Sequence, residues 1–121
     1  MTLSVAEIRQ NFLQRIKTSY AANEHAAIQA RATLCAVVEA LTREFGAKRI
    51  VLFGSLSAGI FRVDSDIDLL VEGIDDGRFM SAMARATEIA GRRVDLVDPL
   101  WADAALIRAA ETAGEILYVA G

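Results

Sequence analysis

The chain has 121 residues and a formal net charge of −3, and hydrophobic residues make up 54% of it. This length predicts a single domain, and the apolar content supports a folded core and excludes an intrinsically disordered chain. No apolar run approaches the ~20 residues of a membrane span, no signal-peptide pattern opens the chain, and the acidic balance argues against broad nucleic-acid binding. We therefore expect a cytoplasmic globular protein.

The N-terminal third reads as helix. Residues 5–45 contain neither glycine nor proline, and their apolar residues recur at spacings of three and four. Ser4 is suited to cap the start, with Glu7 three residues later completing a capping box. One helix of this length would extend roughly 60 Å, whereas a domain of this size has a radius of gyration of about 14 Å. We expect either a break near residues 22–24 or a projecting first half, with residues 23–45 packed on a sheet.

An apolar stripe marks the first half of this segment, and it consists of Ile8, Phe12, Ile16 and Tyr20. A projecting helix would expose the stripe, and exposed stripes are usually covered by a partner or by a second copy of the chain. The alternative is that the helix folds back on its own domain. We accordingly divide the chain into an N-terminal helical segment, residues 1–45, and a core, residues 46–121.

Two isolated side chains on this segment carry no predicted chemistry. Cys35 is the one cysteine, so it has no partner for an internal disulfide, and its place in the apolar pattern predicts a buried free thiol. His25 is the one histidine, and we expect it to be solvated near the possible helix break.

Two short apolar runs, about residues 49–53 and 67–72, predict strands because they are bounded by turn residues and rich in β-branched side chains. Their short connection favours an antiparallel pair, and residues 56–59 within it can form one helical turn. Further along, glycines at positions 91 and 114 end two predicted helices, about residues 78–90 and 102–113. Strands are predicted at about residues 93–97 and 115–119, and Trp101 is expected to anchor a helix start against the core.

The turn between the first two strands is where chemistry is expected. Side chains alternate across a strand, so Asp66 and Asp68 share one face, roughly 7 Å apart. Two carboxylates this close resist ionisation unless a cation lies between them, and oxygen ligands of this kind suit Mg²⁺. Gly54 lets the backbone approach a ligand, and free N–H groups beside the Ser55 hydroxyl favour phosphate. A metal site beside a phosphate cradle predicts a nucleoside triphosphate site.

Each element also has a simpler reading. A lone Gly-Ser is a common turn, and a lone Asp-x-Asp pair is commonly a solvated strand end. Asp64, Asp66 and Asp68 also resemble the start of a calcium-binding loop. That loop requires glycine where Leu69 stands, and helices on both sides where strands are predicted.

The combination is more specific than its parts. An apolar strand, Phe53-Gly54-Ser55, ten residues, Asp66-Ile67-Asp68 and a second apolar strand resemble the signature of the polymerase-beta-like nucleotidyltransferase superfamily, and within it the minimal nucleotidyltransferases. Residues 92–97 resemble the third acidic strand of that group, with Asp95 as its acid. The resemblance covers about residues 46–120 and implies an α+β fold, with a mixed sheet of about four strands packed against helices.

The resemblance also implies an activity. Asp66, Asp68 and Asp95 would bind two Mg²⁺ ions, Asp95 would help to activate the attacking hydroxyl, and Gly54 with Ser55 would hold the triphosphate. The expected reaction moves a nucleoside monophosphate, most simply AMP from ATP, to a hydroxyl. Proteins of this type resemble antitoxins that modify a tyrosine of a helical HEPN-type toxin, so the implied partner is such a toxin, or a second copy bound through the N-terminal helix.

Two further functions stay open at this point. Many minimal members carry an arginine before the second glycine of the turn, where this chain has Ala58, and Arg62 is the nearby residue that would replace that charge. A site without it is also compatible with a binding module that neutralises a toxin by contact alone. Transfer to a small molecule such as an aminoglycoside is the other alternative, although such enzymes usually carry an additional helical domain.

Overall fold

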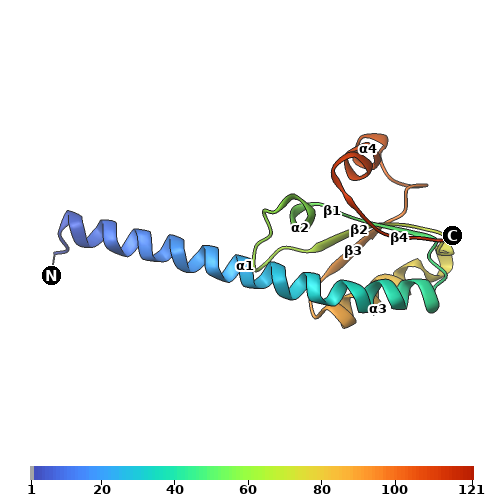
Figure 1. Ribbon diagram of the computed structural model, residues 1–121, viewed down its shortest axis with the longest axis horizontal. Coiled ribbons are helices and arrows are strands. Elements are labelled where there is room, and N and C mark those ends of the chain that lie inside the picture. Colours follow the sequence, from blue (N-terminus) through green and yellow to red (C-terminus); the bar gives the residue numbers. More distant parts are fainter. Residues whose placement is uncertain (1) are drawn as a thin grey trace.

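Four helices and four strands make up the protein in the computed structural model, which describes residues 2–121 (Figure 1). In chain order they are α1 (Val5–Arg43), β1 (Arg49–Phe53), α2 (Ser55–Ala58), β2 (Ile67–Glu72), α3 (Asp76–Ala90), β3 (Val94–Val97), α4 (Ala104–Ala113) and β4 (Glu115–Val119). The predicted ends of β1, β2 and β4 are confirmed. The structure corrects three predicted starts: α3 begins at Asp76 directly after its N-cap Asp75, α4 begins after its N-cap Asp103, and β3 begins one residue later than expected.

The strands form one mixed sheet in the order β3-β2-β1-β4. Strand β1 is antiparallel to both β2 and β4, whereas β2 and β3 are parallel because α3 carries the chain back across the sheet between them. The α+β class, the four-stranded mixed sheet and the antiparallel β1–β2 pair are therefore confirmed.

Helix α1 is a single continuous helix of 39 residues, so the break considered near residues 22–24 does not occur. Nothing in that stretch interrupts the backbone, and the Asn23 side chain instead accepts a hydrogen bond from the Val63 N–H at 3.1 Å. At the start, the Ser4 hydroxyl accepts from the Glu7 N–H at 3.1 Å, as its predicted capping role requires. The first half of α1 extends away from the sheet, and only the second half packs on it (Figure 1).

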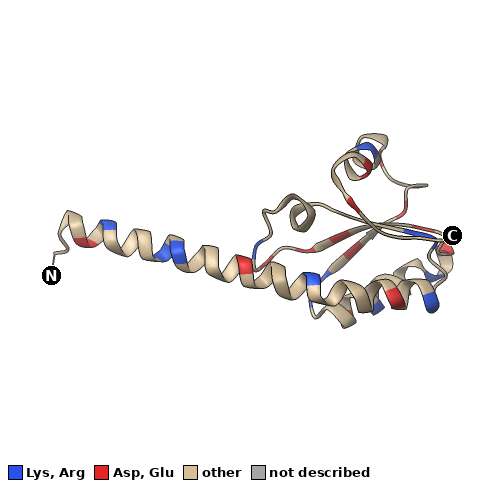
Figure 2. Cartoon of the chain, in the orientation of Figure 1, with Lys and Arg blue, Asp and Glu red and all other residues tan. Residues whose placement is uncertain are grey.

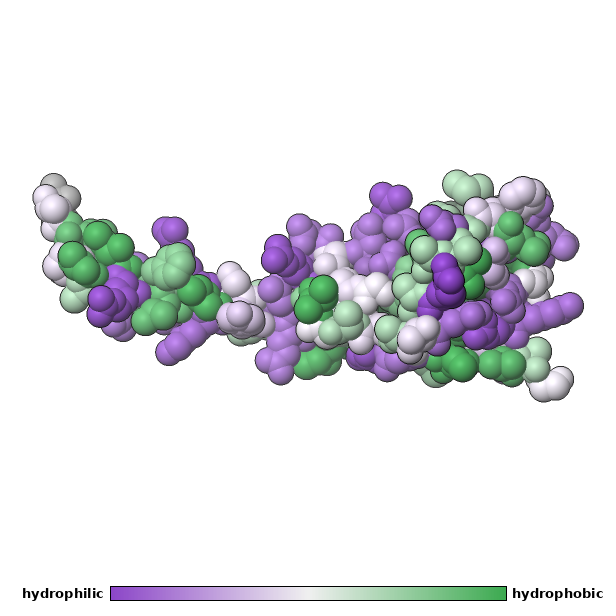
Figure 3. Space-filling view, turned by 90° about the horizontal axis from the view of Figure 1, so that it is seen from above, coloured by the Kyte–Doolittle hydropathy of each residue, from purple (hydrophilic) through white to green (hydrophobic). Residues whose placement is uncertain are grey.

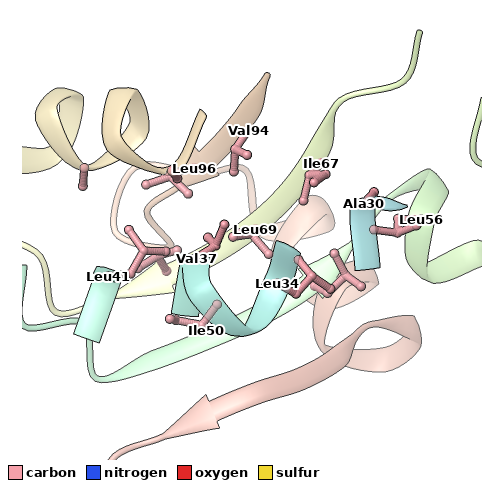
Figure 4. Packing of buried hydrophobic residues seen from close by; sticks show 14 of the residues in the cluster. Ala30, Leu34, Val37, Leu41, Ile50, Leu56, Ile67, Leu69, Val94 and Leu96 are labelled. Carbon is pink, nitrogen blue, oxygen red and sulfur yellow. The ribbon is translucent and has the colours of Figure 1, made fainter. Parts of the chain in front are cut away.

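The main core lies between one face of the sheet and the pair α1 and α3 (Figure 4). Helix α1 contributes small and branched residues that reach the strands, among them Ala30, Leu34, Val37 and Leu41. Alternate residues of the strands pack against them, including Ile50, Leu52, Ile67, Leu69, Val94 and Leu96. The period-two pattern along the strands therefore sets which face is apolar.

The opposite face of the sheet is only partly covered. Helix α4 packs there through Ala110 against Val51 and Leu70. Asp68 precedes Leu70 by two residues on the same face of β2, beyond the area that α4 covers. One end of this face is thus left to polar side chains.

Two predictions about single side chains were wrong. Cys35 is exposed because it faces away from the sheet, between the buried Leu34 and Val37 on α1. Trp101 is 76% exposed and anchors no core, and its indole N–H instead lies 3.4 Å from the Asp76 carboxylate. His25 is exposed as expected, although on an unbroken helix. Among residues 2–121, no helix combines the length and the apolar character that crossing a membrane requires.

Candidate active site

Three carboxylates meet at the end of the sheet where β2 begins. Asp68 on β2 and Asp95 on β3 are direct neighbours in the parallel register, and Asp66 lies two residues before Asp68. Figure 2 shows acidic residues in red on the strands of the sheet. The residues flanking them, Ile67 and Val94, are fully buried in the main core, so the pleat turns the acids to the other face. The structure therefore brings together the three acids that the sequence singled out.

The predicted glycine-serine turn lies against the same carboxylates. Phe53 pairs with Asp68 across β1 and β2, so Gly54 leaves the sheet directly beside that acid. Gly54 has φ +76° and ψ −154°, a conformation almost confined to glycine. A Cβ added there would lie 3.1 Å from Asp68 Cγ and would collide with the carboxylate oxygen. The backbone can approach the acid this closely because residue 54 has no side chain.

Ser55 opens the one-turn helix α2, and Gly54 occupies its N-cap position without a side chain to cap it. The first backbone N–H groups of a helix have no partner within the helix and attract anions. Ser55 is half-buried and offers a hydroxyl at the same place. The turn thus has the hydrogen-bond donors that a phosphate requires, next to carboxylates that favour a cation.

Burial raises the pKa of Asp68 to about 6 from its ordinary value of 3.8, with the charges of Asp95 and Asp66 as further causes. Arg93 acts in the opposite direction and lowers that pKa. Its Nε lies 2.9 Å from Asp95 Oδ1 and 3.8 Å from Asp66 Oδ2. Arg93 is 69% exposed, so solvent weakens its ion pairs with the two acids.

These residues fit a magnesium site by their chemistry. They supply carboxylate oxygens, the donor type that Mg²⁺ prefers, and their mutual repulsion disfavours full ionisation in the absence of a cation. Among residues 2–121, no group of three or more aspartate, glutamate, histidine or cysteine side chains lies close enough together to hold a metal ion. Arg93 supplies the cationic group that contacts two of the three acids.

Two arginines of the site were missed as functional candidates. Arg93 stands directly before β3 and two residues before Asp95, and that spacing was the available signal. Arg92 donates to the carbonyls of Val63 and Ser65, at 2.9 and 2.6 Å, and its guanidinium lies 4.7 Å from the centre of the Phe61 ring. It therefore fixes the loop that leads into Asp66, a long-range contact with no signature in the sequence.

Arg62, considered as a replacement for the charge missing at Ala58, lies on this loop. Its backbone N–H donates to the Ser65 hydroxyl at 2.9 Å, and its side chain is exposed. Arg62 lines a cavity of about 570 Å³ whose wall includes Leu56 and Ser57 of α2. The position is near the phosphate cradle, and its role as a substitute charge stays a prediction.

We expect the metal-free chain to lose stability as the pH rises from about 4 to about 6. In that window the folded state holds a proton on Asp68, whose pKa is about 6, more tightly than the unfolded state, whose pKa is 3.8. Unfolding then releases a proton, so a higher pH favours the unfolded chain. Asp68→Asn removes this loss and should raise the melting temperature at about pH 7 while leaving the temperature near pH 4 almost unchanged.

Thermal melts of both proteins in excess EDTA measure this difference. The carboxylates away from this site titrate in both proteins and cancel in the comparison. A variant that melts below the parent chain at neutral pH would contradict the inference that the charged form of Asp68 destabilises the folded chain.

Comparison with known proteins agrees with this geometry. The family model "Polymerase beta, Nucleotidyltransferase" matches residues 36–120. Among solved structures, a chain of a toxin–antitoxin complex with AMP-PNP is 28% identical with a TM-score of 0.61, and the match covers 69% of this chain and 71% of that chain. A protein proposed to be a minimal nucleotidyltransferase is 29% identical with a TM-score of 0.62, and the match covers 77% of this chain and 95% of that one.

A third structure shares the fold. It contains a tri-AMPylated Shewanella oneidensis HEPN toxin with its MNT antitoxin, and the similar chain is 23% identical with a TM-score of 0.60, over 74% of this chain and 72% of that one. No curated protein is significantly similar in sequence. The family model spans well over half of the chain and includes the three acids and the glycine-serine turn. The chain therefore belongs to the polymerase beta nucleotidyltransferase family.

Proposed function

We propose that this chain transfers AMP from ATP to a hydroxyl of a partner protein, a tyrosine of a HEPN-type toxin, and so acts as an antitoxin. One observation carries the proposal: Asp66, Asp68 and Asp95 share the open end of one sheet face, and Gly54 brings its backbone against Asp68. Acidic metal ligands and a phosphate cradle in contact are what phosphoryl transfer requires.

In this proposal each residue has a role. Asp66 and Asp68 would hold Mg²⁺, with Asp95 as a further ligand, and Gly54 and Ser55 would bind the β- and γ-phosphates. The acceptor oxygen forms a bond to the α-phosphorus, the bond to pyrophosphate breaks, and Asp95 accepts the hydroxyl proton. Two Mg²⁺ ions, when bound, would neutralise charge on the attacking and leaving oxygens.

The similar structures support the choice of nucleotide and partner. One is a toxin–antitoxin complex with AMP-PNP, and another pairs an MNT antitoxin with an AMPylated HEPN toxin. Both statements concern those proteins. The acids and the turn of this chain are the features by which the same activity is proposed here.

A contact-only antitoxin is the second candidate, and one observation favours it. Arg93 pairs with Asp95 at 2.9 Å and approaches Asp66, so a cation from the chain itself already balances part of the acidic charge. Together with Ala58 in the turn, this arrangement is compatible with a site that no longer turns over.

Incubation with ATP labelled at the α-phosphate, Mg²⁺ and the cognate HEPN-type toxin separates the two. We expect label and the mass of AMP on a toxin tyrosine, with no transfer when EDTA is added. A stable complex without label, under conditions where the chain binds Mg²⁺ and AMP-PNP, would replace transfer by contact-only neutralisation. The absence of any complex would reject the antitoxin role itself.

A further inference from the structure

The projecting half of α1, residues 5–22, carries an apolar surface that the rest of the chain leaves exposed. This segment is called the arm below. Phe12 is 64% exposed and Tyr20 is 72% exposed, and Ile8 and Ile16 lie on the same stripe. Figure 3 shows hydrophobic side chains gathered along the arm between hydrophilic ones. The family model begins at residue 36, so the arm lies outside the part of the chain that the family model matches.

The arm continues the face of α1 that packs on the sheet. Ile8, Phe12 and Ile16 stand 18 residues before Ala26, Ala30 and Leu34, which are buried in the core. At 3.6 residues per turn this spacing is about five full turns, so each pair lies on one line along the helix. The stripe is therefore the extension of a packing surface beyond the last residue that the sheet covers.

A groove forms where the arm meets the body. Its volume is about 720 Å³, and it is lined by Phe12, Arg15, Ile16 and Tyr20 on the arm and by residues 62–64 on the loop. The loop is fixed there by the Val63 N–H bond to Asn23 and by Arg92, which holds the Val63 and Ser65 carbonyls. The groove thus lies between the arm and a loop that hydrogen bonds fix in place.

The groove opens beside the candidate active site. Its last lining residue on the loop is Asp64, which lies in the turn that the Ser65 N–H closes on the Arg62 carbonyl, and Asp66 follows two residues later. A segment lying along the arm would consequently end at the edge of the sheet where the three carboxylates meet.

Charge indicates what the groove receives. Arg9 and Arg15 stand three residues before and after Phe12, which places them about 60° to either side of it. Arg62 adds a third cation on the loop, and Asp64 is the carboxylate among the lining residues. Two identical arms laid stripe to stripe would oppose arginines to arginines, because Glu7 is on the far side of the helix. The flanks therefore favour a carboxylate-bearing partner over a second copy.

We propose that the groove receives an amphipathic helix of the acceptor protein, with an apolar stripe that packs on Phe12 and Ile16 and carboxylates that flank it. The identity of that protein as the HEPN-type toxin rests on the proposed function. Docking on the arm positions the acceptor so that its hydroxyl reaches the three carboxylates. Helix-in-groove binding with buried aromatic and aliphatic anchors concentrates affinity in a few residues.

The test compares two double variants of the full chain. Phe12→Glu with Ile16→Glu places two charges on the stripe, and Gln10→Glu with Gln14→Glu places the same charges about 160° away on the exposed back of the arm. Binding of the purified cognate toxin is measured by calorimetry, and AMP transfer is measured in the same samples. We expect the stripe variant to bind roughly 100-fold or more weakly, and the back variant to bind as the parent does.

Equal binding by both variants, with transfer intact, overturns the proposal that the acceptor docks in the groove and leaves the proposed function standing. Weak binding by the stripe variant, with no AMP transfer by the parent chain or by either variant, supports docking in the groove and overturns the proposed transfer activity. A toxin that does not bind the parent chain rejects both.

Two measurements address other occupants. Light scattering should find the chain alone as a monomer, and a dimer that the stripe variant abolishes would overturn the proposal in favour of a second copy. Co-sedimentation with anionic phosphatidylserine vesicles should be absent, and vesicle binding lost in the stripe variant would overturn it in favour of a membrane.

Discussion

Asp66→Asn and Asp68→Asn should each reduce AMP transfer by roughly 1,000-fold or more. Each change replaces a carboxylate by an amide of the same shape, so the fold is retained while a charged metal ligand is lost. Asp68 and Asp95 are direct neighbours across β2 and β3, and Asp66 lies on the same face. Losing one acid would therefore remove a ligand of the Mg²⁺ ions that would neutralise the negative charge developing during phosphoryl transfer. Rates of labelled AMP transfer under single-turnover conditions measure the effect.

Asp75→Asn is the matched control. It removes one exposed carboxylate beyond the other end of β2, at the N-cap of α3, where the Asp75 side chain makes no capping hydrogen bond. We expect its transfer rate to stay within a few-fold of the parent. Comparable losses in all three variants would point to net charge as the cause, and unaffected transfer by Asp66→Asn and Asp68→Asn would remove these residues from the mechanism.

Gly54→Ala should reduce both the stability of the chain and its transfer activity. The residue has φ +76° and ψ −154°, where a side chain is strained by about 1–3 kcal/mol. The new Cβ would also collide with the Asp68 carboxylate, which has to move. We expect a loss of unfolding free energy of that size or more, and transfer reduced at least 100-fold, because the displaced acid no longer faces Asp66 and Asp95.

Gly59→Ala tests the effect of backbone strain without a clash between the new Cβ and Asp68. Gly59 has φ +77°, but no atom lies within 4 Å of a Cβ built there. It should cost about 1–2 kcal/mol of stability and leave most of the transfer activity. Chemical denaturation and single-turnover rates of both variants provide the comparison. Equal loss of activity in the two would show that backbone strain alone, without contact to Asp68, explains the effect.

The parts of the fold that depend on local pattern could be predicted from the sequence. Alternation placed Asp66 and Asp68 on the face opposite to Ile67, whereas the position of Asp95 beside them was expected only from the family resemblance. Glycine positions predicted where helices end, and Gly91 indeed closes α3 with a left-handed backbone. These features are set by residues close in sequence, so periodicity is sufficient to find them.

What the sequence did not predict depends on contacts between distant residues. Trp101 was expected to anchor a helix start against the core, but it remains 76% exposed, and its indole N–H lies 3.4 Å from the Asp76 carboxylate. Cys35 lies in an apolar pattern that spans more of the helix surface than the sheet can cover, so its side chain remains exposed. Arg92 acts on a loop 27 residues earlier in the chain, a pairing that only the folded structure displays.

We expect the three acids and the glycine-serine turn to surround one metal–nucleotide site. Paramagnetic broadening by Mn²⁺ with AMP-PNP, observed in carbon and amide NMR spectra, measures whether they do. We predict rapid loss of the carboxyl signals of Asp66, Asp68 and Asp95 and of the Gly54 and Ser55 amides, while Glu39 on the outer side of α1 persists. Broadening that spares Asp95 or the turn would contradict the account.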